Sequence, residues 1–315
     1  MTTEQPSLFP LDGLQANPDS SESGLSASST LESALPHFER FMAERDFSAH
    51  TRAAFLNDLK LFLEYLEPQT PLSACSVKRL QGFLTYLEHG RGVPLSKRSL
   101  DRRITTLKVF FGWLAEEEVL PNDPAAALLH LGARSAPPRV LTEGQIDQVL
   151  TLTRRLRDAA DKPDARPHLL VLLLLDTALK KSECMNLDLA DIDVSDAQHA
   201  SVLVAYDRPR QRFKGRRVAV SAEWARTLPA YLAQYKPQVK LFECTGRNLE
   251  YLLHNLATQA GLSFALSFAM LRWTSAVRSL KGGMDDNTLR QRLGLSRIAW
   301  QEAGPLLRTL AQGPL

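Results

Sequence analysis

The sequence predicts a mainly α-helical protein of two domains, with a small β-hairpin in the second domain. The chain has 315 residues, more than the roughly 100–200 residues of one typical domain. Apolar residues recur every three to four positions through most of its length, which is the period of an amphipathic helix. Two β-branched segments, Ser201–Tyr206 and Arg217–Ser221, flank a basic stretch and predict the hairpin.

Residues 1–30 predict a disordered tail. They are rich in Ser and Pro and show no sustained periodicity, so they cannot bury enough apolar surface to offset the entropy of ordering. They contain four acidic and no basic residues, whereas the whole chain has 38 basic and 35 acidic ones. The other 285 residues therefore carry a net charge of +7, a mildly basic balance that permits a polyanionic partner.

Residues 31–132 predict a compact domain of four helices. The first begins near Leu31, and the second has Ser48 as its N-cap, a residue type whose hydroxyl accepts a hydrogen bond from the first turn. The third covers Ala74–Glu88 and the fourth begins near Ser96. In the second and fourth helices the apolar residues lie on one face, which predicts a shared core.

Residues 133–141 predict a linker, because they contain a Pro-Pro pair and residues before Pro prefer extended conformations. Residues 142–315 form the second domain. It opens with a helix capped by Thr142, and Gln145 is placed for the reciprocal hydrogen bond of a capping box. The further helices expected in this domain are Pro167–Lys180, Trp224–Tyr235 and Asn248–Ala260.

Several classes of protein do not fit this sequence. The longest apolar run, Leu169–Leu175, is far shorter than the ~20 residues that span a bilayer. The N-terminus lacks the basic region followed by an apolar stretch that marks a secretory signal. The three cysteines are scattered and the histidines lack ligand spacing, so we expect no disulfide framework, no metal and no cofactor. A cytoplasmic, nucleoid-associated protein is the expectation.

The fourth helix is a candidate for binding DNA. Arg98 and Arg102 point away from its apolar stripe, and Lys97, Arg103 and Lys108 flank the stripe. Such a row of cations can neutralise phosphates and release counterions. A solvated helix face gives the same pattern, and both interpretations stay open.

The predicted hairpin tip is more concentrated in charge. Six of the ten residues at positions 208–217 are basic. Basic residues beside a β-ribbon can lie along a groove or a phosphate backbone. The DNA-binding candidates at the tip are Arg210, Arg212, Lys214 and Arg216.

Four short segments of the second domain carry a specific pattern. Leu174–Leu187 is similar to the motif L-x-x-T-G-L-R-x-S-E-x-x-x-L, and Leu187–Asp193 to the L-x-x-x-D-I-D that follows it. Leu271–Ala276 is similar to L-R-H-x-F-A, and Leu293-Gly294 to the start of L-G-H. In this order they resemble the tyrosine recombinase (phage integrase, Xer-type) family, over about residues 31–310. The resemblance implies an N-terminal four-helix SAM-like core-binding domain and a C-terminal tyrosine-recombinase-type domain.

The resemblance also implies a chemistry. Members of this family cut DNA by attack of a Tyr on a phosphate, which needs cations around the phosphate and an acid for the leaving oxygen. The first family Arg falls on Lys180, which lacks the planar fork of Arg. The second is retained as Arg272. The hairpin Lys falls on Lys214, or on Gln211 in a shifted alignment. Lys180 and Arg272 could equally serve as structural ion-pair partners.

The remaining family positions are changed. The two family His fall on Ala269 and Leu295, and the nucleophilic Tyr falls on Gly304. A shift of register does not restore them, because residues 255–315 contain neither Tyr nor His. The resemblance thus predicts a recombinase fold that does not cut DNA, since loss of the nucleophile abolishes the covalent route.

The leading functional hypothesis is an accessory or architectural DNA-binding subunit in site-specific recombination or integration. It would contact double-stranded DNA through the basic helix and the basic hairpin, beside an active tyrosine recombinase. Two alternatives stay open. One is an active recombinase that uses a nucleophile donated by a partner. The other is a protein-interaction scaffold that no longer binds DNA.

A short segment of the tail suggests another partner. Gln5, Leu8 and Phe9 lie in a stretch that resembles the Q-L-[SD]-L-F peptide with which bacterial proteins dock on the replication sliding clamp. Leu8 and Phe9 could fill an apolar pocket while Gln5 forms hydrogen bonds at its edge. The residue between Gln5 and Ser7 is Pro, which departs from that peptide.

Overall fold

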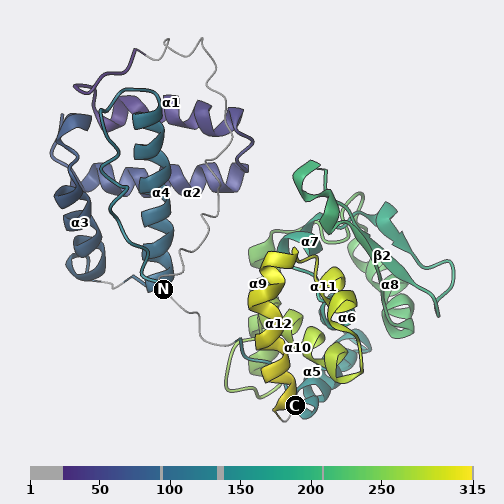
Figure 1. Ribbon diagram of the computed structural model, residues 1–315. Helices are drawn as coiled ribbons and strands as arrows, with labels where there is room; N and C mark the ends of the chain where they lie inside the picture. Colours follow the sequence, from purple (N-terminus) through teal and green to yellow (C-terminus); the bar gives the residue numbers. More distant parts are fainter. Residues whose placement is uncertain (1–23, 93–94, 133–137, 208, 314–315) are drawn as a thin grey trace. The chain divides into compact units, whose positions relative to one another are not determined.

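The computed structural model describes residues 24–92, 95–132, 138–207 and 209–313 (Figure 1). The chain divides into two compact units, Met1–Ser135 and Ala136–Leu315. The described part is mainly helical with one small sheet, as predicted. No helix in it combines the length and the apolar character needed to cross a membrane.

The described residues of the first unit form four α-helices and two short helical turns. The α-helices are α1 (Leu31–Glu44), α2 (Ala49–Tyr65), α3 (Val77–Thr85) and α4 (Lys97–Glu116). The N-cap predicted at Ser48 is confirmed, because its hydroxyl accepts a hydrogen bond from the Thr51 N–H at 2.9 Å. Ser96, near which the fourth helix was expected to begin, caps α4 by accepting a hydrogen bond from the Ser99 N–H at 3.2 Å.

The third helix is shorter than the predicted Ala74–Glu88. Ser76 caps it, so α3 begins at Val77, and Leu72–Ala74 forms a separate 3₁₀ turn, η1. After α3 the chain widens into one π-helical turn, η2 (Tyr86–Gly90). The local cap at Ser76 therefore overrides the longer helical pattern.

Aromatic rings fill the core of the first unit. The Phe38 and Phe110 rings meet edge to face with centroids 5.1 Å apart, and Phe62 lies 4.9 Å from Phe83. All four side chains are at most 1% exposed. These pairs tie α1 to α4 and α2 to α3, and buried aromatic pairs add to the apolar area removed from water.

The second unit contains eight α-helices and three short strands among its described residues. The helices are α5 (Glu143–Arg157), α6 (Arg166–Thr177), α7 (Lys181–Asn186), α8 (Ala222–Tyr235), α9 (Gly246–Gln259), α10 (Phe268–Lys281), α11 (Asp286–Arg292) and α12 (Arg297–Gln312). The capping box predicted for α5 is confirmed, with Thr142 and Gln145 exchanging hydrogen bonds of 3.0 and 3.2 Å.

Helix α6 is the centre of the second unit. All its residues from Pro167 to Leu175 are buried, and it contacts α5, α8 and α10. It ends at Thr177, three residues before the predicted Lys180, because Ala178 takes a left-handed conformation with φ +54°. The family motif has Gly at this position, a residue that adopts positive φ without steric cost.

The sheet has three antiparallel strands in the order β1 (Ile192–Asp193), β2 (Ser201–Val204) and β3 (Arg216–Ala219), and Figure 1 shows it beside α8. The predicted hairpin is confirmed by the pairing of β2 with β3. At its tip, Pro209–Lys214 forms a 3₁₀ turn, η4.

Candidate functional site

The family-motif positions meet around one buried carboxylate, Glu183, in the first turn of α7. Both its oxygens accept hydrogen bonds from Arg216, at 3.0 and 2.9 Å. The Tyr206 hydroxyl donates to it at 2.6 Å and the backbone N–H of Lys180 at 2.9 Å. Burial raises the pKa of Glu183, but the hydrogen bonds and charge of Arg216 outweigh burial and lower it to about 2. Glu183 is therefore an ionised, internally satisfied carboxylate.

Arg216 is part of this network and not of an exposed basic tip. Its side chain is only 9% exposed. Besides the pair with Glu183, its Nε donates to the Arg292 carbonyl at 2.6 Å and an Nη to the Lys214 carbonyl at 3.0 Å. Arg216 therefore compensates the buried carboxylate, and its assignment to DNA binding stays a prediction.

Gly294 provides the space for the Arg216 guanidinium. Its φ is +58°, and a Cβ built at this position would lie 2.8 Å from an Arg216 Nη atom. Any side chain at 294 would therefore displace the guanidinium from Glu183. The Gly of the Leu293-Gly294 motif has a packing role here.

The retained family Arg, Arg272 on α10, joins three segments. One Nη donates to the Ala178 carbonyl, the other to the Leu293 carbonyl at 2.6 Å, and Glu183 lies 3.9 Å away. Its side chain is 13% exposed. Burial lowers the pKa of Arg272 to about 10, although Glu183 opposes this. The structural interpretation of Arg272 is therefore supported by its contacts.

Lys180 and Lys214 lie near the same cluster. Burial lowers the pKa of the half-buried Lys180 ammonium. The negative charge of Glu183 raises this pKa, and the charges of the neighbouring basic residues lower it further. Lys214 Nζ lies 5.8 Å from the Tyr206 ring centroid and 5.5 Å from that of Phe213. Lys214 and Gln211 are both half-buried in η4, so the choice between them for the family's hairpin Lys stays open.

The three changed positions differ in their surroundings. Ala269 is exposed in the first turn of α10. Leu295 packs against a small apolar cluster that also includes Trp300. Gly304 is buried in α12, and a Cβ there would lie 2.9 Å from the Trp300 ring. The space beside residue 304 is filled by an indole ring.

In the first unit, the predicted basic row on α4 is only partly exposed. Arg103 is 7% exposed, and its Nε lies 3.6 Å from the buried Asp58 of α2. Arg102 donates both Nη groups to Asp58, one of them at 2.8 Å, with its side chain 43% exposed. Arg103 is therefore buried beside Asp58, whereas Arg102 pairs with the same carboxylate and stays partly exposed, and the assignment of both to DNA binding stays a prediction.

The other three residues of the row differ from one another. Lys97 and Arg98 are exposed in the first turn of α4. Lys108 is half-buried, and its Nζ donates to the Ala126 carbonyl at 3.2 Å. The solvent-facing charge of α4 is therefore concentrated at its N-terminal end.

Sequence reasoning missed Asp58 and the partners of Glu183. Asp58 lies three residues after Phe55 on the apolar side of α2, and a carboxylate at a core position is a signal for a buried ion pair. Glu183 is the acidic residue of the family motif, so a partner for it could have been sought among the basic residues of the hairpin. Nothing in the sequence around Tyr206 indicated that its hydroxyl donates to Glu183.

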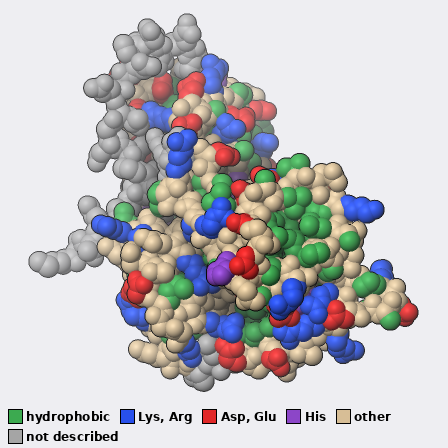
Figure 2. Space-filling model, turned by 90° about the vertical axis from the view of Figure 1, so that its right-hand side faces the viewer, with side chains coloured by type: hydrophobic (Ala, Val, Ile, Leu, Met, Phe, Trp, Pro, Cys, Tyr) green, Lys and Arg blue, Asp and Glu red, His purple; other side chains and the backbone are tan. Residues whose placement is uncertain are grey.

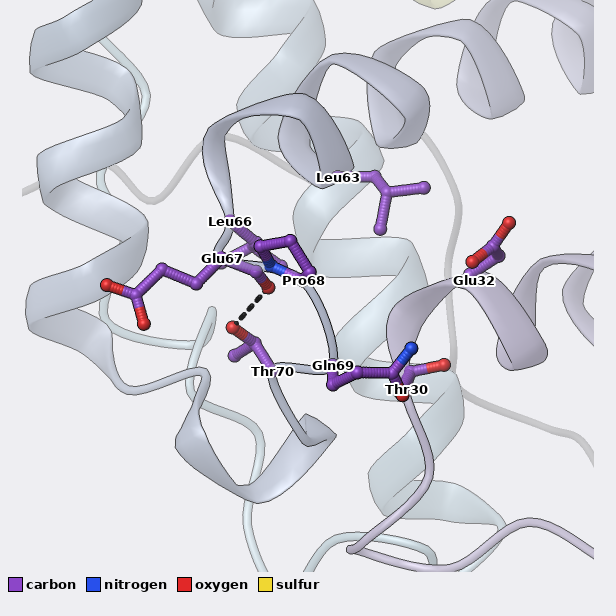
Figure 3. A pocket seen from close by; sticks show the side chains of 8 residues that line it. All are labelled: Thr30, Glu32, Leu63, Leu66, Glu67, Pro68, Gln69 and Thr70. Carbon is purple, nitrogen blue, oxygen red and sulfur yellow. Dashed lines mark hydrogen bonds between the residues drawn. The ribbon is translucent and has the colours of Figure 1, made fainter.

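The surface and cavities add two observations. Figure 2 shows Lys and Arg side chains interspersed with acidic ones on the face it displays. A pocket of about 210 Å³ in the first unit is lined by apolar and acidic side chains, including Leu63, Glu32 and Glu67, and the Thr70 hydroxyl donates to the Glu67 carbonyl at 2.7 Å (Figure 3). Its two carboxylates do not favour an anionic ligand.

Two other expectations concern metals and the tail. Among the described residues, no group of three or more His, Cys, Asp or Glu side chains could hold a metal ion. Gln5, Leu8 and Phe9, and with them the predicted clamp-binding peptide, lie outside the described residues. Arg210 lies in η4, and its side chain is also outside the described set.

Comparison with family models decides the assignment. Residues 35–118 match the phage integrase N-terminal SAM-like domain, and residues 139–300 match the phage integrase family. The chain belongs to the phage integrase family. This confirms the predicted tyrosine recombinase resemblance and the two-part, mainly helical fold of its members.

Similar proteins support the family assignment. Tyrosine recombinase XerC of Mycobacterium sp. (strain JLS) is 26% identical over 283 residues, covering 85% of this chain and 92% of the relative. XerC of Mycobacterium bovis (strain BCG / Pasteur 1173P2) is 27% identical over 292 residues, with the same coverage.

Two solved structures share the fold of this chain. A λ integrase dimer bound to a COC′ core site has a TM-score of 0.65 at 18% identity, covering 87% of this chain and 77% of that one. The XerH recombinase bound to a palindromic difH substrate, in a post-cleavage complex, has a TM-score of 0.67 at 16% identity, covering 90% and 82%.

Proposed function

We propose that this phage integrase family member binds double-stranded DNA in site-specific recombination or integration and does not cleave DNA itself. Its role is that of an accessory or architectural subunit beside an active tyrosine recombinase. The observation that carries the proposal is the residue at the family's nucleophile position. That residue is Gly304, which has no side chain and lies against the Trp300 ring.

The other chemical groups of the family are also altered. Ala269 and Leu295 cannot transfer a proton to a leaving oxygen. Arg272 directs two donors at backbone carbonyls. Lys180 supplies charge without the bidentate geometry of Arg. A single donated Tyr would therefore not restore cleavage.

Binding to DNA is supported by the family and by the exposed charges. The XerH and λ integrase structures contain DNA. In this chain Lys97 and Arg98 are exposed at the start of α4, and Arg212 is exposed in η4. Exposed cations on each unit can neutralise phosphates, which gives an affinity that falls steeply with salt.

A suicide substrate separates binding from cleavage. The protein is incubated with a nicked duplex that traps the covalent 3′-phosphotyrosyl product of an active recombinase, and a mycobacterial XerC serves as the positive control. We expect salt-dependent gel-shift complexes and no covalent adduct on a denaturing gel. A covalent adduct would overturn the inactive assignment, and no binding at low ionic strength would overturn the DNA-binding assignment.

Mixing tests the partner-dependent alternative. The protein is combined with a catalytically intact recombinase on the same substrate, with the Lys180→Ala variant as the matched control. We expect any cleavage in the mixture to be unaffected by that substitution. Cleavage that disappears with Lys180→Ala would instead show that this chain contributes an active site to the partner's Tyr.

A further inference from the structure

The tip of the β2–β3 hairpin presents an exposed phenyl ring. Phe213 in η4 is 61% exposed, and no other Phe of the described residues reaches the exposed class. Removing such a side chain from water stabilises a protein, so an isolated exposed ring forgoes this gain. A partner that covers the Phe213 ring would therefore be stabilised by removing the ring from water.

The base of the tip is held firmly in place. The turn is closed by a hydrogen bond of 2.9 Å from Gly215 N–H to the Arg212 carbonyl. The Lys214 carbonyl accepts a hydrogen bond of 3.0 Å from Arg216, which is itself paired with the buried Glu183. The ring is thus presented from an anchored turn, which lowers the entropy cost of using it in an interface.

One cation lies beside the ring in space, and others lie near it in the chain. Lys214 Nζ lies 5.5 Å from the Phe213 ring centroid, and the Arg212 side chain is exposed next to it in the chain. Arg217, the first residue after Arg216, is also exposed, with its guanidinium 3.2 Å from the Ser201 hydroxyl and 3.9 Å from Asp193. An apolar ring among cations complements a partner whose apolar surfaces lie between rows of negative charge. Base pairs between two phosphate backbones have this arrangement.

We propose that Phe213 inserts against a base step of the bound duplex, while Arg212 and Lys214 contact the flanking phosphates. Apolar side chains that enter a base step unstack it partly and bend the duplex. The hairpin tip would thus make this chain a DNA-bending subunit. This inference rests on the proposed DNA-binding function and adds the group that deforms the DNA.

A mismatch preference tests the insertion without knowledge of a target sequence. A mismatched step is already less stacked, so a protein that inserts a ring binds it more tightly than a fully paired step. The ratio of the two affinities is measured for two duplexes that differ only by a central mismatch. We expect the unmodified protein to prefer the mismatched duplex by about tenfold, the scale of one base–aromatic stacking contact.

The variants assign that preference to the ring. Phe213→Ala is expected to reduce the ratio to about one, and Phe213→Leu, which keeps an apolar group of similar reach, to retain part of it. Val239→Ala removes an apolar side chain of the same 61% exposure away from the hairpin tip, and we expect it to leave the ratio of affinities unchanged. Arg212→Gln is expected to weaken binding to both duplexes equally and to reduce the salt dependence of that binding.

The outcomes separate this inference from the function it rests on. If Phe213→Ala keeps the mismatch preference, or the unmodified protein shows none while binding both duplexes, the insertion is refuted and DNA binding stands. If the unmodified protein binds neither duplex, both proposals fail. Binding of the hairpin tip to an acidic protein, lost in Phe213→Ala while DNA binding is unchanged, would assign the ring to a protein partner and also refute the insertion.

Discussion

The two units each bury one carboxylate among arginines, yet the two clusters differ in how well the carboxylate is satisfied. Glu183 of the second unit receives two hydrogen bonds from Arg216, one from Tyr206 and one from a backbone N–H. Asp58 of the first unit receives those of Arg102 and one of 3.0 Å from Thr106.

The protonation equilibria of the two carboxylates shift in opposite directions. For Glu183 burial is the largest single cause and raises the pKa, but the hydrogen bonds from Arg216, the Lys180 N–H and Tyr206 and the charge of Arg216 together outweigh it, and the pKa falls to about 2. For Asp58 burial is the largest cause and raises the pKa, although Arg102 and Arg103 oppose it. Burial therefore does not decide the state of a carboxylate by itself, and the number of donors that face it matters as much.

The largest expected effect comes from removing the better-satisfied carboxylate. Glu183→Ala leaves the Arg216 guanidinium, only 9% exposed, without its counter-charge. We expect a loss of about 3–5 kcal/mol in the free energy of unfolding, measured in urea. The double variant with Arg216→Leu should recover part of that loss, because it removes the uncompensated charge. No recovery would mean that the pair is not the cause.

The second effect is on the pH dependence of stability. Because the pKa of Glu183 is about 2 when folded and 4.5 ordinarily, its stabilisation is present above about pH 4.5 and is lost as the pH falls toward 2. Between about pH 5 and about pH 3 this one group should remove about 2 kcal/mol from the free energy of unfolding.

Glu183→Gln provides the matched control for that measurement. The variant should lose less stability than the unmodified protein over the same pH range, because the amide does not titrate. Asp58 contributes to the pH dependence of stability with the opposite sign. Because its pKa is raised in the folded state, its protonation stabilises the fold as the pH falls. Equal acid sensitivity of the two proteins would contradict the role of Glu183.

A smaller effect is expected at the other cluster. Asp58→Asn keeps an acceptor for the Thr106 hydroxyl, and Arg102, 43% exposed, can turn toward water. We expect a loss of about 1–2 kcal/mol in urea unfolding, less than for Glu183→Ala. A loss as large as that of Glu183→Ala would show that Arg103, and not Arg102, determines the cost.

The smallest effect concerns the turn whose carbonyl binds Arg272. Ala178→Gly relieves the positive φ of +54° but removes a fully buried methyl group and adds freedom to the unfolded chain. These contributions oppose each other, so we expect a change within about 1 kcal/mol. A large loss in thermal unfolding would show that the methyl group, and not the backbone conformation, matters at this turn.

Local signals in the sequence predicted what depends on neighbouring residues. The caps at Ser48 and Thr142 are confirmed because a hydroxyl and the N–H groups it serves lie within one turn. The burial of Arg103 was not predicted, because it depends on Asp58, which belongs to another helix.

The candidate site shows the same division. Motif order was enough to place Lys180, Arg272 and Gly304 at family positions, since motifs are themselves local. The role of Arg216 was not predicted, because its partner Glu183 lies 33 positions earlier in the chain. A count of basic residues at the hairpin tip cannot distinguish a cation that faces solvent from one that compensates a buried acid.

The bare backbone at Gly294 has a consequence for how such chains are recognised. The Leu293-Gly294 pair is a marker of the family, yet here the Gly is required by the guanidinium beneath it. A homology search that scores this pair detects a requirement for space next to the Arg216 guanidinium. That requirement is the same whether or not the protein cleaves a DNA strand. Diagnostic patterns for recombination activity should therefore be anchored on the proton-transferring and nucleophilic side chains, and not on the glycine beside them.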